Sequence, residues 1–273
     1  MLCRMKSSAI RGNRFVAPWS EINMERVMEN REFLMTLAEI EVAFRFHFNG
    51  TEMLFRSYEH KEVPDKYTGE FLTADLQEIQ IYAAEKNVSQ EFAEYWRLME
   101  KTADFLTIHG CTMFHGVAII FGNGAYILTA PSGTGKSTQY RNLKTLYGER
   151  INIINGDKPI LGVGSKGFIM VYPSPWNGKE GWGGDIPAPL RGVFLLEQGK
   201  SNILESMDMK DAAIPVIQQF IYTAPSRQSV HTVFRMADTM LGSVPIYKFS
   251  NRGDLVSSSM LFEQIIKIEE QWR

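Results

Sequence analysis

Alternating apolar and polar residues predict two pairs of strands. Phenylalanine alternates with basic residues over residues 44–48, which is the pattern of a strand with one buried face. Asn49-Gly50 follows directly and favours the positive φ angles of a tight hairpin turn. Residues 53–58 are therefore expected to form the return strand.

The second pair flanks Asn123-Gly124, with apolar strands expected at residues 117–121 and 125–129. An antiparallel hairpin would then lead into the glycine-rich segment that follows residue 129. In a Rossmann-type P-loop domain, the strand before such a segment is instead reached through a helical crossover. The pattern therefore favours a mixed α/β fold with substantial antiparallel sheet.

Apolar residues at three- and four-residue spacing predict the helices. One begins after Ser89, a residue type that caps helix N-termini, and continues to Leu106. Pro215 is expected to kink or delay the helix that begins at Asp208. The other helices are expected at residues 138–147, 208–222, 226–241 and 255–272. We divide the chain into a smaller N-terminal α+β region, residues 1–108, and a larger region, residues 109–273.

The composition is that of an ordinary globular protein of 273 residues, with 44% hydrophobic and 22% charged residues. A formal net charge of −2 gives no general attraction to nucleic acid or to an anionic membrane. No apolar stretch approaches the roughly 20 residues of a membrane span, and residues 1–20 are basic without an apolar signal core. We therefore expect a cytoplasmic protein that binds neither nucleic acid nor membrane.

The segment that follows residue 129 reads APSGTGKST, which is typical of a phosphate-binding (Walker A) loop. Such a loop turns backbone N–H groups toward a phosphate and ends at a helix N-terminus. Ala130 replaces the first glycine of the motif, but a small side chain can suffice at the end of a strand. Lys136 would reach the β- and γ-phosphates, and Ser137 would hold Mg²⁺. The predicted nucleotide contacts are Ser132, Gly133, Thr134, Gly135, Lys136, Ser137 and Thr138.

A second glycine pattern, GVGSKG at residues 162–167, formally matches the dinucleotide-binding motif. It lies between two strand-like runs, residues 159–161 and 168–172, and no helix follows it as that motif requires. We predict a hairpin turn there.

A carboxylate stands where a phosphate-transferring enzyme needs one. Asp157 follows the apolar residues Ile151, Ile153 and Ile154, at the expected end of a strand. Kinases use such a carboxylate to hold Mg²⁺ or to accept the proton of the nucleophile. A simple Asn-Gly-Asp turn is the alternative, and the phosphate loop upstream favours the functional interpretation.

The stretch FHGVAIIFGNGAYILTAPSGTGKST, followed by INGDKP, resembles the catalytic core of the HPr kinase/phosphorylase family. That family has a phosphoenolpyruvate carboxykinase-like nucleotide-binding fold, and the resemblance covers roughly residues 105–250. It implies that His115 and Asp157 face the transferred phosphate. The family's Asp-Asp pair is Gly156-Asp157 here, which leaves open how proton acceptance and metal binding are divided. The resemblance carries over no phosphorylase activity.

The loop YPSPWNGKEGWGGDIPAPLRG, residues 172–192, is expected beside the phosphate site. Trp176 could stack on a base or exclude water, and Lys179 could neutralise the transferred phosphate. Lys158 and Arg227 are further candidate contacts of substrate or phosphate. A surface loop pinned by its tryptophans is the alternative.

Together these patterns predict an ATP- and Mg²⁺-dependent kinase that transfers the γ-phosphoryl group to a hydroxyl. The predicted catalytic residues are Asp157, His115 and Lys136, and the predicted metal ligands are Ser137 and Asp157. The resemblance implies a serine of a protein or peptide as acceptor and suggests homo-oligomers. A regulatory nucleotide-binding module without turnover, a small-molecule kinase of the same fold and a simple NTPase remain alternatives.

Overall fold

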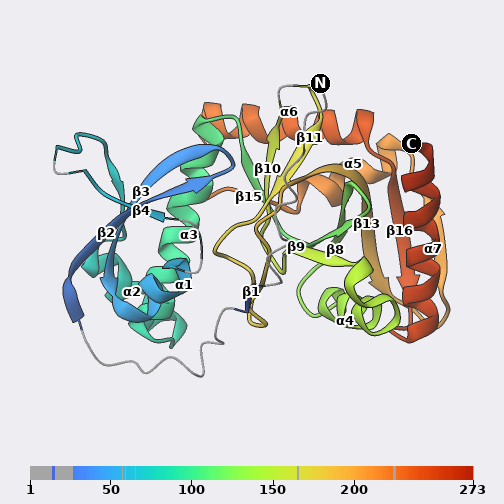
Figure 1. Cartoon of the computed structure of the whole chain (residues 1–273), viewed down its shortest axis with the longest axis horizontal. Coiled ribbons are helices and arrows are strands. Elements are labelled where there is room, and N and C mark those ends of the chain that lie inside the picture. The colour runs from blue at the N-terminus through green and yellow to red at the C-terminus, as the bar shows by residue number, and fades with distance from the viewer. Residues whose placement is uncertain are drawn as a thin grey trace, which may run out of the picture.

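The computed structural model describes residues 14–15, 27–56, 58, 60–64, 66–164, 166–223 and 226–272, with side chains from Glu32 onward. Two sheets organise this part of the chain (Figure 1), which confirms the mixed α/β class. The expectation for residues 1–20 lies, apart from the backbone of Arg14 and Phe15, outside the described residues.

The smaller sheet has the strand order β4-β2-β3-β5. Helices α1, α2 and α3 pack beside it on the left of Figure 1. These elements are β2 (Val27–Leu37), β3 (Ile40–Phe48), α1 (Asn49–Arg56), β4 (His60–Glu62), β5 (Phe71–Leu72), α2 (Leu76–Lys86) and α3 (Gln90–Ile108).

The strand predicted over residues 44–48 is confirmed as the end of β3, but the hairpin predicted after it is wrong. The tight turn lies upstream, where Ala38 and Glu39 have φ angles of 47° and 67° and connect β2 to β3. Asn49-Gly50 instead begins α1. Phe55 on this helix is fully buried, with edge-to-face contacts to the phenylalanines of β3. Burial of that ring outweighs the local preference of Asn-Gly for a turn.

Twelve strands of the described residues form the larger sheet, in the order β1-β12-β9-β7-β8-β13-β11-β10-β6-β15, with β16 beside β13 and β14 beside β16. They are β1 (Arg14–Phe15), β6 (Thr112–Phe114), β7 (Val117–Phe121), β8 (Gly124–Thr129), β9 (Asn152–Asn155), β10 (Ile160–Val163), β11 (Ile169–Tyr172), β12 (Trp182–Gly183), β13 (Ala188–Gln198), β14 (Ile203–Ser206), β15 (Phe220–Ile221) and β16 (Ile246–Asn251).

The centre of this sheet confirms the second predicted hairpin. Strands β7 and β8 pair antiparallel around Asn123-Gly124, and β8 then pairs parallel with β13, which is parallel to β16. Strands β10 and β11 are also antiparallel, so the glycine pattern between them is the predicted hairpin connection and no helix follows it.

Helices cover both faces of the central strands. Along β8, Ala125 and Ile127 point to a core with α5 (Met209–Ile217) and α6 (Arg227–Ser243). Tyr126 and Leu128 point to the opposite core, with α4 (Lys136–Tyr147) and α7 (Leu255–Gln271). This two-sided burial explains why β8 is apolar at nearly every position, since each face of the strand meets a helix layer.

The predicted helices after Ser89, at 138–147, 226–241 and 255–272 are confirmed within two or three residues. Ser89 caps α3 by accepting a hydrogen bond from the backbone N–H of Phe92. The helix after Asp208 ends earlier than predicted, because residues 220–221 pair with β6 as strand β15. A short 3₁₀ turn, η2 (Gly148–Arg150), follows α4.

One apolar core joins the two sheets. Phe44 and Leu98 of the smaller sheet and its helices share this core with Met113 and Ile160 of the larger sheet. Trp176, from the loop after β11, is also part of it and is 1% exposed. Helix α3 and its sheet therefore pack against β6 and against β10, the strand that follows Asp157.

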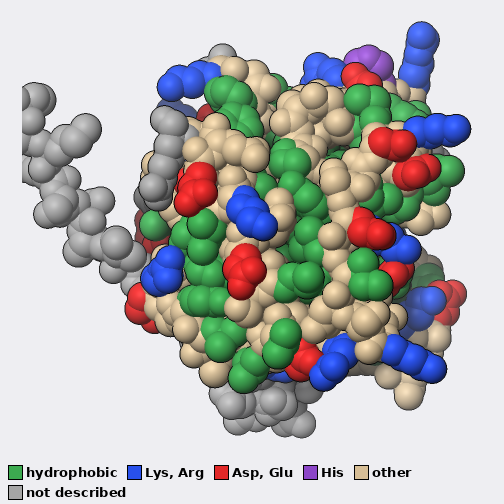
Figure 2. Space-filling view, turned by 90° about the vertical axis from the view of Figure 1, so that its right-hand side faces the viewer, with side chains coloured by type: hydrophobic (Ala, Val, Ile, Leu, Met, Phe, Trp, Pro, Cys, Tyr) green, Lys and Arg blue, Asp and Glu red, His purple; other side chains and the backbone are tan. Residues whose placement is uncertain are grey.

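Figure 2, which views the molecule from the α7 side, shows apolar and charged side chains interspersed over this face. The exposed apolar residues of α7 are Leu255, Val256 and Met260. Among the described helices, none combines the length and apolarity needed to cross a membrane.

Glu94 on α3 is a buried carboxyl group whose ionisation should affect stability. Its two oxygens accept hydrogen bonds from the backbone N–H groups of His47, at 2.6 Å, and Phe48, at 3.2 Å. Burial raises the pKa of Glu94 from its ordinary value of 4.5 to about 7, although those hydrogen bonds act to lower it. Between these pH values the unfolded chain loses the Glu94 proton while the folded chain retains it.

Stability should therefore fall as pH rises through this window. We expect the unfolding free energy of the wild type, relative to that of Glu94→Gln, to fall by about 3 kcal/mol between pH 4.5 and 7. Urea denaturation at several pH values measures this difference. The exposed Glu85→Gln variant on α2 is the control and should track the wild type. A pH-independent difference for Glu94→Gln would contradict the prediction.

Candidate active site

The glycine loop connects β8 to α4. Gly133 and Gly135 have φ angles of 83° and 103°, in the left-handed region that glycine adopts without strain. A Cβ atom added at either position would meet no heavy atom within 4 Å, so both positions border open space. Ala130 is not among the described residues with positive φ, which explains why alanine can stand in place of the first glycine of the motif.

A cavity of about 420 Å³ lies over this loop, facing the end of β9. Thr134, predicted to contact nucleotide, is not part of the lining; its hydroxyl donates to the carbonyl of Pro131 at 2.8 Å and closes the loop. The lining residues are His115, Ser132, Gly133, Gly135, Lys136, Ser137, Thr138, Arg141, Gly156, Asp157, Gly178, Lys179 and Glu180.

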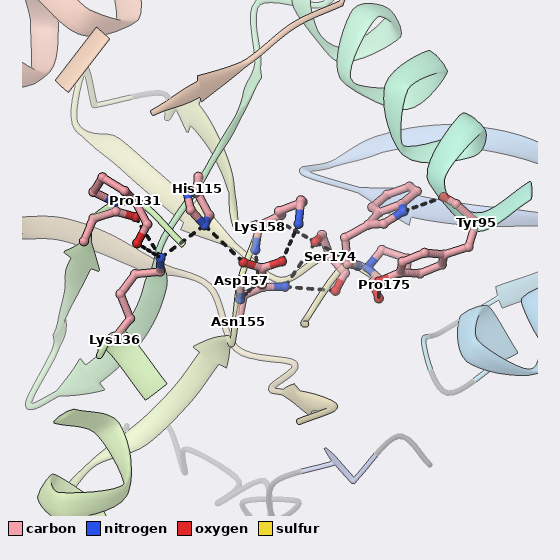
Figure 3. Close-up of polar contacts among 11 residues, drawn as sticks. Tyr95, His115, Pro131, Lys136, Asn155, Asp157, Lys158, Ser174 and Pro175 are labelled. Carbon is pink, nitrogen blue, oxygen red and sulfur yellow. Dashed lines mark hydrogen bonds and ion pairs between the residues drawn. The ribbon is translucent and has the colours of Figure 1, made fainter. Parts of the chain in front are cut away.

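Three of the predicted site residues that line this cavity meet one another (Figure 3). The Lys136 ammonium donates to the carbonyl of Ala130 at 2.8 Å and lies 3.1 Å from His115 Nε2. His115 Nε2 lies 3.5 Å from Asp157 Oδ1. The structure thus brings a cation, an imidazole and a carboxylate together from the start of α4, the β6–β7 corner and the end of β9.

The electrostatics define the state of the histidine. Burial is the main cause that lowers the pKa of His115, and the nearby charge of Lys136 acts in the same direction, while Asp157 partly opposes both. Burial also lowers the pKa of Lys136. An ammonium group can only donate, so Nε2 of the neutral ring accepts and its proton is on Nδ1. In this arrangement Asp157 is the side chain suited to accept a proton.

Asn155, which the sequence analysis missed, fixes the turn that carries Asp157. Its side-chain oxygen accepts hydrogen bonds from the backbone N–H groups of Asp157, at 2.9 Å, and Lys158, at 2.6 Å. Its amide group donates to the carbonyl and hydroxyl of Ser174, at 3.0 and 3.1 Å. The Asn-Gly-Asp sequence is a signal for such an Asx turn and could have identified Asn155.

Lys158 makes an ion pair with the second oxygen of Asp157 and lies 5.5 Å from the centre of the Trp96 ring. It is not among the residues that line the cavity. Arg227, another predicted contact, is the exposed first residue of α6 and does not line the cavity either. Lys179 is exposed and does line it.

The prediction that Trp176 stacks on a base or shields the site is wrong. The ring is buried in the shared core, edge-to-face with Phe55, and its Nε1–H donates to the carbonyl of Tyr95 at 3.1 Å. Its backbone carbonyl accepts from the N–H of Lys158 at 3.0 Å. Trp176 therefore anchors the loop next to Asp157 instead of contacting a ligand.

Two further contacts at the cavity were not predicted. Arg141 of α4 pairs with Glu180 at 3.1 Å and lies 5.2 Å from the Trp182 ring, which ties the loop after β11 to α4. Gln198, at the end of β13, donates to the carbonyl of Gly133 at 3.3 Å. The apolar run that ends in Glu-Gln at residues 193–198 is a sequence signal for a strand that ends at Gln198.

No protein-family model matches the chain, and no curated protein matches it. Among solved structures, it is similar to the Hpr(Ser) kinase/phosphatase from Coxiella burnetii, with 8% sequence identity and a TM-score of 0.36. The match covers 58% of this chain and 93% of that chain. At this identity and TM-score the likeness carries no conclusion about the chemistry of this chain.

Proposed function

We propose that the protein is an ATP- and Mg²⁺-dependent kinase that transfers the γ-phosphoryl group to a hydroxyl. The convergence of His115, Lys136 and Asp157 at the wall of the glycine-loop cavity carries this proposal. A loop that only binds an anion needs no carboxylate beside its lysine. Phosphoryl transfer needs one, either to hold the metal or to accept the acceptor's proton.

The loop suits a triphosphate in one orientation. Lysine in such loops contacts the β- and γ-phosphates, and the first turn of the following helix contacts the α-phosphate. The γ-phosphate would thus lie near Lys136 and His115, and the nucleoside near Thr138 and Arg141, which also line the cavity. Lys136 would leave the carbonyl of Ala130 to make this contact.

The residues present fit Mg²⁺ as it binds with nucleotides. In the described part of the chain, no group of three or more His, Cys, Asp or Glu side chains could hold a metal by itself. Mg²⁺ needs no such group, because one or two protein oxygens, phosphates and water complete its shell. Ser137 and Asp157 line the cavity and would supply those oxygens. When bound, the metal would neutralise charge on the phosphates.

In the proposed reaction one bond to the γ-phosphorus forms and another breaks. The acceptor oxygen bonds to the γ-phosphorus, and the bond from that phosphorus to the bridging oxygen of ADP breaks. The hydroxyl proton passes to the Asp157 carboxylate. Lys136 and the N–H groups of the loop would stabilise the charge on the transferred group. The motif resemblance to the HPr kinase family favours a serine of a protein or peptide as the acceptor.

Radiolabel transfer tests the proposal. Purified protein is incubated with [γ-³²P]ATP and Mg²⁺, with and without a lysate or a panel of serine peptides, and both labelled acceptors and free phosphate are quantified. We expect acceptor-dependent labelling that Lys136→Ala abolishes, while Lys144→Ala, on the same helix, retains it. ATP binding without labelling would instead indicate a regulatory module, and acceptor-independent phosphate release an NTPase.

A further inference from the structure

A second cavity, of about 470 Å³, lies beside the chain segment that begins the glycine loop. It is near the carboxyl ends of the parallel strands β8 and β13, and α5 closes one side of it. Its volume is within the range of roughly 300–1,000 Å³ that is usual for ligand sites. It is lined by Thr129, Ala130, Pro131, Leu195, Leu196, Glu197, Met207, Pro215, Gln218, Gln219 and Lys248.

We infer that this second cavity binds an apolar side chain next to the phosphorylated hydroxyl of a peptide acceptor. The inference rests on the proposed kinase function and assigns a substrate class to it. It depends on three features: where the cavity lies relative to the γ-phosphate, what lines it, and how it connects to His115.

The cavity adjoins the γ-phosphate end of the site. Ala130 and Pro131 line it, and their carbonyl groups lie 2.8 and 3.5 Å from the Lys136 ammonium. The predicted nucleoside end, at Thr138 and Arg141, lines the first cavity alone. An acceptor must approach the γ-phosphorus in line with and opposite to the departing ADP. In the proposed complex, the peptide residues next to the acceptor hydroxyl therefore lie closer to the second cavity, and the nucleobase lies farther from it.

The lining of the second cavity favours an uncharged ligand group. Its walls are mainly aliphatic, from Leu195, Met207 and Pro215 together with the start of the loop. The two charged residues, Glu197 and Lys248, pair with each other at 3.2 Å and so leave no net charge to recruit a phosphate or a charged side chain. Burial of a ligand's apolar surface is the favourable contribution that such walls can make.

Gln219 lines this cavity and also contacts His115. Its backbone carbonyl accepts from the N–H of His115 at 2.8 Å, and its side-chain amide donates to the carbonyl of Pro215, another lining residue, at 3.4 Å. The neighbouring residue, Gln218, is the C-cap of α5, lines the cavity and is exposed. A larger side chain at position 218 can fill the cavity without disturbing the buried core.

Peptide selectivity tests the inference. The probes are short synthetic peptides with one central serine, in which one neighbouring position at a time is Leu, Phe, Asp, Lys or Gly. For wild type, we expect one position to favour Leu or Phe by about 10-fold or more in kcat/KM. Gln218→Trp should remove this preference and raise KM for the favoured peptide about 10-fold, with a much smaller change in KM for ATP.

Gln228→Trp, at an exposed position of α6, is the matched control and should behave as wild type. Transfer to peptides with no apolar preference at any position would overturn the inference. So would a Gln218→Trp variant that raises KM for ATP and not for peptide, because the cavity would then bind the nucleobase.

A binding measurement separates this inference from the proposed function. In protein labelled with ¹³C-methyl methionine, the Met207 signal should shift on addition of the favoured Leu or Phe peptide and not on addition of a non-hydrolysable ATP analogue. If the kinase phosphorylates the favoured peptide but that peptide does not shift the Met207 signal, only the inference about the second cavity is overturned. Absence of labelling on every peptide and lysate protein would overturn the kinase function and this inference with it.

Discussion

Replacing Asp157 by asparagine is expected to lower the rate of phosphoryl transfer by about 10²- to 10⁴-fold, the usual contribution of a positioned acid or base. Asparagine keeps the size of the side chain and cannot accept the acceptor's proton. It also removes the charge that faces His115 and Lys158. Single-turnover transfer from [γ-³²P]ATP at saturating acceptor measures the effect.

The matched control is Asp238→Asn, at an exposed position of α6, which should retain wild-type transfer. Binding of a fluorescent ATP analogue without Mg²⁺ should survive in Asp157→Asn, because the glycine loop and Lys136 are intact. If this variant transfers phosphate at the wild-type rate, Asp157 is neither the proton acceptor nor a required metal ligand.

Replacing Trp176 by alanine is expected to lower the free energy of unfolding by about 3–5 kcal/mol, the usual range for truncating a buried aromatic residue. The ring is 1% exposed and packs against Phe55 and Tyr95. Its loss leaves a cavity between the two sheets and removes the hydrogen bond from the indole N–H to the carbonyl of Tyr95. Urea denaturation followed by far-UV circular dichroism measures the change.

Trp272→Ala is the control, because that ring is 41% exposed at the end of α7 and packs only against Phe168 and Arg191 among the ring contacts described for it. Its cost should be clearly smaller. A change below 1 kcal/mol for Trp176→Ala would contradict the view that this tryptophan anchors the loop beside Asp157.

The elements that could be predicted from sequence are those whose signals are local. The β7–β8 hairpin is specified by Asn123-Gly124 between two apolar runs, and α3 by Ser89 ahead of apolar residues at helical spacing. In each case a few neighbouring residues supply both the pattern and the boundary. The glycine loop belongs to this class as well, since its turn residues and the helix after it are contiguous.

The predictions that failed depend on distant partners. Asn49-Gly50 is a good turn signal, yet residues 49–56 are helical. In this helix the ring of Phe55 packs against β3 and Trp176. Trp176 is in a loop rich in glycine and proline, which suggests exposure, but α3 and the smaller sheet cover its ring. Neither contact can be read from neighbouring residues, because the partners lie many residues away along the chain.

The glycine loop, its lysine and serine, and the carboxylate after the next strand can be recognised from the chain alone, because each is defined by residue spacing. Folding brings Lys136, His115 and Asp157 together, lets Asn155 hold the turn of Asp157, and places a second, apolar cavity beside the loop. Spacing carries no information about these contacts, because helices packed on both faces of the larger sheet determine which strand ends become neighbours.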